Sequence, residues 1–275
     1  MSPNLNYYKN KVADTWPNDH EISKEFIFYL KEVLDLKDTA IYIDRDYLLS
    51  NDEQGAIEEF INHKKNGVPL DYILKKSFFY GNEFLVDKRV LIPRPETELL
   101  VDYINNLKFL DDIKILDAGT GSGCIGISIA IDNPNIEVYG LDYSAKSIEV
   151  ANANKNYFEL NNFSLIHSDW LSSIKDRSID IVVSNPPYID SEDKHLRDLI
   201  HEPISALVAS EGGLGDFKVI SYQASLKLKK GGILIFEHGY QQASDVSNIM
   251  RENGFNNIES FKDHQSHLRI TKGII

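Results

Sequence analysis

Residues 117–126 read Asp-Ala-Gly-Thr-Gly-Ser-Gly-Cys-Ile-Gly, and this stretch decides the fold. It follows an apolar run at 113–117 that is typical of a buried strand, and it leads into an apolar helical stretch. The alternate glycines Gly119, Gly121 and Gly123 let the backbone turn tightly and come close to a ligand. Amides at the start of the helix would face that ligand. The stretch predicts a cofactor-binding strand–loop–helix unit, with a tight turn that holds no ligand as the alternative.

Strands and helices alternate on the C-terminal side of this loop. The expected strands are 113–117, 136–142, 164–169, 179–184 and 232–237, with helices that include 144–156 and 241–253. Regular alternation predicts an α/β fold: a doubly wound, mostly parallel, Rossmann-like sheet. Two final strands, near 258–262 and 268–272, are too close for a helical crossover, so we expect a C-terminal antiparallel hairpin.

The N-terminal part has a different, helical pattern. Residues 25–36 are apolar with dispersed charges, and Ser50 with Glu53 predicts a capping box for a helix that Gly67 ends. Strands around Gly81-Asn82 predict a hairpin. We expect a small helical domain at 1–75, a β-hairpin linker at 76–92 and the sheet domain at 93–275.

Composition narrows the class of protein. The chain has 275 residues, 42% hydrophobic and 26% charged, which is typical of a globular protein. A single cysteine, Cys124, excludes an internal disulfide, and no residue spacing predicts a metal site. No signal peptide or membrane span is evident, so we expect a cytoplasmic protein. The net charge of −13 weighs against a nucleic-acid partner, since nucleic-acid binding depends on cations.

Acidic residues help to choose the cofactor. Gly121, Gly123 and Gly126 also satisfy the dinucleotide fingerprint, so NAD has to be considered. Asp142 lies 19 residues beyond Gly123, where a carboxylate would bind ribose hydroxyls of NAD or S-adenosylmethionine equally. Asp117 is unfavourable for a pyrophosphate but favourable for a sulfonium and an ammonium group. We therefore favour S-adenosylmethionine.

Asp169 and Trp170 end the third expected strand and face the same crevice. A carboxylate and an indole could hold an adenine ring there, although a tryptophan is as often a core residue.

The fourth expected strand delivers Asn185-Pro-Pro-Tyr188 to the same edge of the sheet. Two prolines keep the backbone extended and leave carbonyl groups without local donors. Asn185 offers a carboxamide oxygen, and Tyr188 offers a ring for stacking. The tetrapeptide predicts a rigid pair of acceptors for a planar NH2 group, whereas the alternative is prolines that only end a strand.

These two motifs together resemble methyltransferases that modify planar amino or amide nitrogens. Five further stretches, at 67–73, 91–98, 168–170, 202–203 with 206–209, and 236–239, extend the resemblance to the HemK-type protein-(glutamine-N5) methyltransferases, the PrmC family, which act on peptide chain release factors. The resemblance covers essentially the whole chain. It implies that S-adenosylmethionine contacts Gly119, Thr120, Gly121, Ser122, Gly123, Asp142, Trp170 and Asn185. It implies that the glutamine is bound by Asn185, Pro186, Pro187 and Tyr188, with Asn185, Pro186 and Tyr188 as the catalytic residues.

The activity implied is methylation of the N5 amide in the Gly-Gly-Gln motif of class-1 release factors. Residues 1–75 would dock the release factor beside a monomeric enzyme. Methylation of a ribosomal-protein glutamine is one alternative, because a sibling family also carries a motif like His201-Glu-Pro203. Adenine-N6 methylation of nucleic acid is another, but it needs a basic groove that we do not find. A cofactor-binding module without activity would have no use for the acceptor pair.

Overall fold

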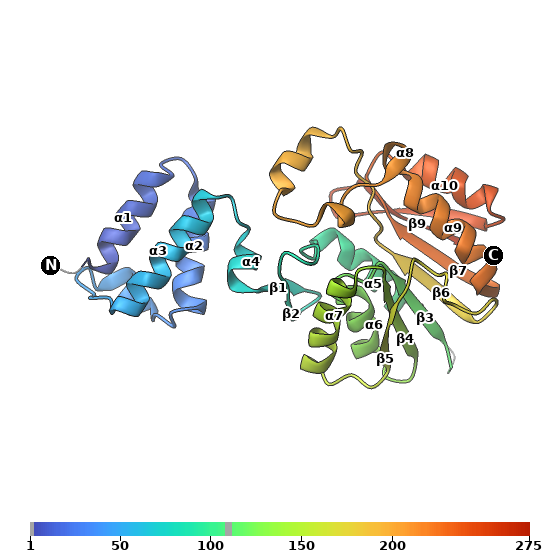
Figure 1. Cartoon of the computed structure of the whole chain (residues 1–275), viewed down its shortest axis with the longest axis horizontal. Coiled ribbons are helices and arrows are strands. Elements are labelled where there is room, and N and C mark those ends of the chain that lie inside the picture. The colour runs from blue at the N-terminus through green and yellow to red at the C-terminus, as the bar shows by residue number, and fades with distance from the viewer. Residues whose placement is uncertain (1–2, 108–111) are drawn as a thin grey trace. The chain divides into compact units, whose positions relative to one another are not determined.

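The computed structural model describes residues 3–107 and 112–275 of the chain (Figure 1). By its internal contacts the chain divides into two compact units, Met1–Lys75 and Lys76–Ile275. No described helix is both long and apolar enough to cross a membrane.

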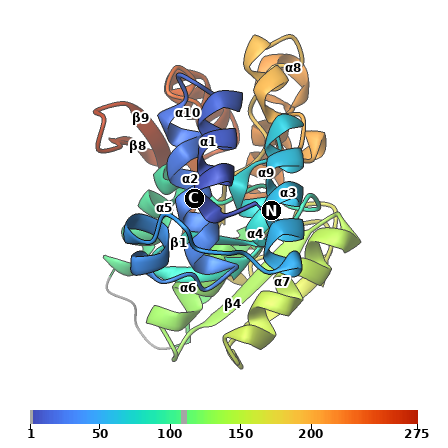
Figure 2. The same cartoon turned by 90° about the vertical axis from the view of Figure 1, so that its left-hand side faces the viewer.

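The first unit is a helical bundle, whose long helices are seen from the side in Figure 2. It contains α1 (Leu5–Thr15), α2 (His20–Glu32), the short π-helix η1 (Thr39–Ile43), α3 (Asn51–Lys65) and α4 (Leu70–Leu74). The predicted capping box at Ser50 and Glu53 is confirmed. Helix α2 begins five residues before the expected 25–36 stretch, because the Asp19 carboxylate accepts hydrogen bonds from the first amides of the helix. Buried side chains such as Phe26, Leu30 and Phe60 form the core of the bundle.

The second unit is built on a seven-stranded sheet in the order β5-β4-β3-β6-β7-β9-β8. The strands are β3 (Lys114–Ala118), β4 (Glu137–Asp142), β5 (Phe163–His167), β6 (Ile179–Ser184), β7 (Leu228–Glu237), β8 (Asn256–Lys262) and β9 (Leu268–Ile274). Strands β3 to β7 are parallel, and β9 pairs antiparallel with both β7 and β8. The predicted fold class and C-terminal hairpin are confirmed. Strand β7 starts four residues earlier than expected, because buried Leu228 pairs with Ile179 ahead of an irregularity in register.

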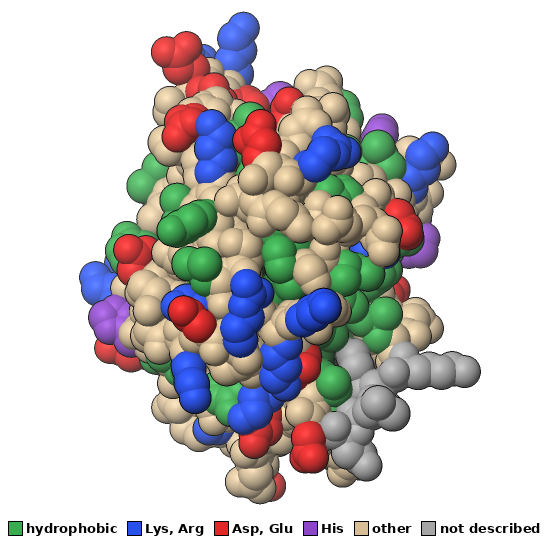
Figure 3. Space-filling view, turned by 90° about the vertical axis from the view of Figure 1, so that its right-hand side faces the viewer, with side chains coloured by type: hydrophobic (Ala, Val, Ile, Leu, Met, Phe, Trp, Pro, Cys, Tyr) green, Lys and Arg blue, Asp and Glu red, His purple; other side chains and the backbone are tan. Residues whose placement is uncertain are grey.

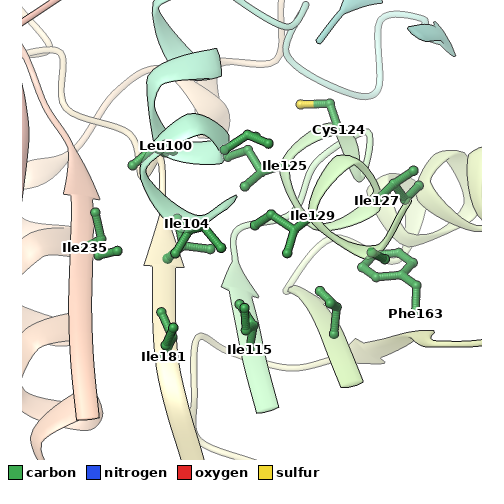
Figure 4. Close-up of a cluster of buried hydrophobic side chains, with 14 of the residues drawn as sticks. Leu100, Ile104, Ile115, Cys124, Ile125, Ile127, Ile129, Phe163, Ile181 and Ile235 are labelled. Carbon is green, nitrogen blue, oxygen red and sulfur yellow. The ribbon is translucent and has the colours of Figure 1, made fainter. Parts of the chain in front are cut away.

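Helices cover both faces of the sheet. One face carries α5 (Glu98–Asn105), α6 (Cys124–Asp132) and α7 (Ala145–Tyr157), and the other carries α9 (Gly215–Lys227) and α10 (Ala243–Glu252). Strand β6 shows the pattern, since Ile181 and Val183 belong to the first core and Val182 to the second. Figure 4 shows the first core, where strand side chains meet α5 and α6. Both faces of the central strands are therefore buried, which explains their nearly continuous apolar sequences.

Short elements complete the second unit. The hairpin of β1 (Lys76–Phe79) and β2 (Asn82–Leu85) turns at Tyr80 and Gly81, both with positive φ. Phe79 and Phe84 anchor it in the first core, to which α5 and α6 also contribute side chains. Four short helices are η2 (Pro95–Thr97), η3 (Lys194–Leu199), η4 (Ile204–Ala206) and α8 (Ser210–Gly213).

Candidate active site

A pocket of about 290 Å³ opens at the carboxyl edge of the parallel strands. Strands β3 and β6 are neighbours there, although the chain visits β4 and β5 between them. Such a reversal of strand order leaves a crevice that binds ligands in doubly wound folds. Six of the predicted site residues line the pocket: Gly119, Gly121, Asp142, Trp170, Asn185 and Pro187. The other five predicted residues are not among the lining residues: Thr120, Ser122, Gly123, Pro186 and Tyr188.

The glycine loop follows β3 and is tied to β4 by its backbone. The amides of Gly119 and Thr120 both donate to the Leu141 carbonyl, each at 2.8 Å. Gly119 and Gly121 have φ of +77° and +54°, a region that favours glycine. A Cβ on Gly121 would meet no atom within 4 Å, so its backbone borders open space in the pocket.

Asp117 lies beneath this loop and not in the pocket. Its Oδ2 accepts hydrogen bonds from the Thr120 hydroxyl at 2.6 Å and from the Gly126 amide at 3.0 Å. Oδ1 has no partner among the described residues, and burial raises the pKa of the carboxyl to about 6. Asp117 therefore braces the turn from below, whereas the sequence interpretation aimed it at the ligand.

Asp142 ends β4 and lines the pocket with a carboxylate that is held in place. Oδ2 accepts from the Gly121 amide at 3.0 Å, and Oδ1 accepts from the Ser144 amide at 2.8 Å. Burial raises its pKa, and these amide hydrogen bonds counteract that rise. Because each oxygen can accept a second hydrogen bond, the carboxylate could still bind a pair of ligand hydroxyls.

Trp170 closes the pocket beside the glycine loop. Strand β5 ends at His167, and Trp170 follows in a turn with φ of +46°, so the residue is not in the strand as expected. A Cβ built on Gly119 would lie 3.1 Å from Cζ3 of the indole, which shows how closely the ring packs on the loop. Asp169 and Asp216 also line the pocket, and burial raises the pKa of Asp216, whereas the nearby indole of Trp170 lowers it.

Asn185 follows β6 and lines the pocket opposite the loop. Its Nδ2 donates to the Thr97 hydroxyl at 3.1 Å, so the carboxamide oxygen is the atom left for a ligand. Pro186 is buried, and the half-buried Tyr188 holds its hydroxyl 3.5 Å from the carboxylate of Glu237. Burial raises the pKa of Tyr188, so the phenol is neutral.

Two lining segments lie outside the predicted site residues. One is the loop Arg89–Leu91, and the other comprises Pro203, Ser205 and Ala206 at η4. Glu202 joins these regions: its buried carboxylate accepts from the Ile92 amide at 3.0 Å and forms an ion pair with Arg94. Through these contacts the His201-Glu-Pro203 segment has a structural role, because it fixes the segment around Ile92 and Arg94 next to the pocket. Only the assembled fold shows it, because the partners are 108 and 110 residues apart.

Comparison with known proteins assigns the family. A methyltransferase-domain family matches residues 110–272. Release factor glutamine methyltransferases of Coxiella burnetii and Vibrio cholerae are 36% and 37% identical to this chain, over 78% and 83% of it and 78% and 81% of their own lengths. The chain belongs to the release factor glutamine methyltransferase family. A methyltransferase of Pyrococcus furiosus shares the fold of this family member, with a TM-score of 0.54 at 14% identity over 82% of this chain and 98% of that one.

The pocket of this family member fits S-adenosylmethionine better than NAD. Three carboxylates, Asp142, Asp169 and Asp216, line it. The guanidinium of Arg89, also at the wall, is already paired with Asp87 and Glu149. This charge distribution attracts a sulfonium and an ammonium group and repels a pyrophosphate.

Proposed function

We propose that this protein transfers the methyl group of S-adenosylmethionine to the N5 amide of the glutamine in the Gly-Gly-Gln motif of class-1 release factors. Family membership supports the kind of acceptor. The observation that carries the chemistry is the Asn185 carboxamide, whose nitrogen is occupied by Thr97 while its oxygen is left for the pocket.

The acceptor amide needs help because its nitrogen lone pair is delocalised into the carbonyl group. Asn185 Oδ1 and the Pro186 carbonyl oxygen accept hydrogen bonds from the two N–H groups of the acceptor amide. These hydrogen bonds orient the amide nitrogen and stabilise the positive charge that develops on it. S-adenosylmethionine, when bound, supplies a methyl group on a positively charged sulfur. The new C–N bond forms as the C–S bond breaks, and the amide proton then leaves to water. Alignment of the nitrogen accounts for much of the rate.

The remaining predicted residues have supporting roles in this proposal. Gly119 and Gly121 give the cofactor close access to the loop backbone, Asp142 binds its ribose hydroxyls, and Trp170 covers its adenine. Pro187 and Tyr188 form the wall beside the target glutamine. Thr120, Ser122 and Gly123 act through the backbone shape of the loop.

A protein acceptor suits the charge of the chain better than a nucleic acid does. On the face shown in Figure 3, several basic side chains gather in the lower part of the view, with acidic side chains beside them. Two lysines illustrate this pairing within the second unit, since Lys227 and Lys229 each lie 2.7 Å from a carboxylate oxygen, of Asp176 and Asp180 respectively. In this proposal the enzyme is a cytoplasmic monomer, and residues 1–75 dock the release factor.

A methyl-transfer assay with labelled S-adenosylmethionine tests the proposal. The acceptors are a class-1 release factor, the same factor with its Gly-Gly-Gln glutamine replaced, a ribosomal-protein fraction and duplex or single-stranded nucleic acid. We expect label on the intact factor alone. Label on ribosomal protein or nucleic acid, with none on the release factor, would overturn the choice of acceptor.

A further inference from the structure

A buried carboxyl group that the proposed mechanism does not use lies next to the acceptor site. Glu237 ends β7 and is 2% exposed. Because Ser184 pairs with Phe236 in the sheet, Asn185 and Glu237 leave neighbouring strands at the same edge. Oε2 of Glu237 has no hydrogen-bond partner among the described residues.

Thr97 contacts Asn185 and lies near this carboxyl group. It is 2% exposed and ends η2, which the two prolines of 92–98 lead into. A hydrogen bond from its hydroxyl favours the charged form of Glu237 and so lowers the pKa, although burial raises that pKa overall to about 7. The other nearby charges are Arg269, which lowers the pKa, and Glu96, which raises it.

The direction of these hydrogen bonds determines how Asn185 is oriented. Nδ2 of Asn185 donates to the Thr97 oxygen at 3.1 Å, which leaves the Thr97 hydroxyl proton for Glu237, whose carboxyl group keeps an acceptor oxygen whether it is charged or protonated. With the Thr97 oxygen as an acceptor, the part of Asn185 that faces it is the NH2 group. The carboxamide oxygen is thereby turned away from Thr97, toward the acceptor amide.

We propose that Thr97 is a positioning residue that orients the Asn185 carboxamide with its oxygen toward the substrate amide. This inference rests on the proposed function, because it assigns a use to the oxygen of Asn185. Without the Thr97 hydroxyl the carboxamide can rotate, and its NH2 group then meets the N–H groups of the substrate. Two sets of hydrogen-bond donors would then face each other, at a position where the native Asn185 presents an acceptor.

The test combines four variants in a single-turnover methyl-transfer assay: Thr97→Val, Thr97→Ser, Asn185→Ala and the double variant Thr97→Val/Asn185→Ala. We expect Thr97→Val to slow methyl transfer roughly 10- to 100-fold through misplacement of the nitrogen, with cofactor affinity by calorimetry unchanged. Thr97→Ser keeps the hydroxyl and should restore most of the rate. In the Asn185→Ala background, Thr97→Val should cost nothing further, because its effect passes through Asn185.

Thr271→Val is the matched control. Thr271 is equally buried in the same unit, but its hydroxyl lies 2.8 Å from Nε2 of His238 and does not contact Asn185. Its loss should lower the melting temperature while the rate of methyl transfer is kept. Equal slowing in the two valine variants, failure of serine to restore the rate, or full additivity with Asn185→Ala would each overturn the inference. Activity of the wild-type enzyme on the release factor reports separately on the proposed function, and the rate ratios can be measured with whichever acceptor it methylates.

Discussion

Replacement of Gly121 by alanine separates binding of the cofactor from folding of the loop. Gly121 has φ of +54°, and a Cβ there would meet nothing within 4 Å, so the methyl group would point into the open pocket. The left-handed backbone costs an alanine roughly 1–2 kcal/mol of folding free energy. A methyl group in space that the cofactor needs costs a further 1–3 kcal/mol or so of binding free energy, by analogy with overpacked cores. The expected loss of affinity is roughly 5- to 150-fold.

Gly81→Ala supplies the control for backbone strain. Gly81 has φ of +72° and open space around its Cα, but it lies in the β1–β2 turn and does not line the pocket. Chemical denaturation should show a similar loss of stability in both variants, and calorimetry with S-adenosylmethionine should show weaker binding only for Gly121→Ala. Wild-type affinity in Gly121→Ala would refute the placement of the cofactor against the loop.

Three further predictions follow from the polar groups of the site. Asp142→Ala should weaken binding of S-adenosylmethionine by about 1.5–3 kcal/mol, because hydrogen bonds to a charged group are lost. An unchanged affinity in calorimetry would contradict the role of Asp142 in cofactor binding. Asn185→Ala should lower turnover roughly 10²–10³-fold with cofactor affinity largely kept, so a wild-type rate would remove it from the mechanism. Glu237 has a pKa raised to about 7 in the folded state, so the native protein keeps a proton that the unfolded chain has lost, and stability falls as pH rises toward 7. Between about pH 4.5 and 7, the free energy of unfolding of the wild type, measured by urea titration, should fall by up to about 1.4 kcal/mol per pH unit. Glu237→Gln should abolish this pH dependence, and an unchanged pH dependence would show that another group causes it.

Much of the fold was predictable because its signals are local. The run 113–126 carries a buried strand, a glycine turn and a helix start in consecutive residues, and each depends on backbone properties of those residues. The same holds for the Ser50 capping box and for the close spacing of the last two strands. Boundaries were less predictable: β7 begins at Leu228, because pairing with Ile179 across the sheet outweighs the lysines and glycine that follow it.

The sequence by itself determined the class of protein and predicted the cofactor loop and the acceptor tetrapeptide, because these motifs place their chemistry within a few consecutive residues. Only the tertiary structure decided how the side chains are used. Asp117 turned out to brace the loop from below, which depends on how the loop folds back over β3. The contact of Asn185 with Thr97 spans 88 residues, and that of Arg94 with Glu202 spans 108. Such contacts depend on the order of strands in the sheet and on which way each loop turns, and no local pattern along the chain encodes either.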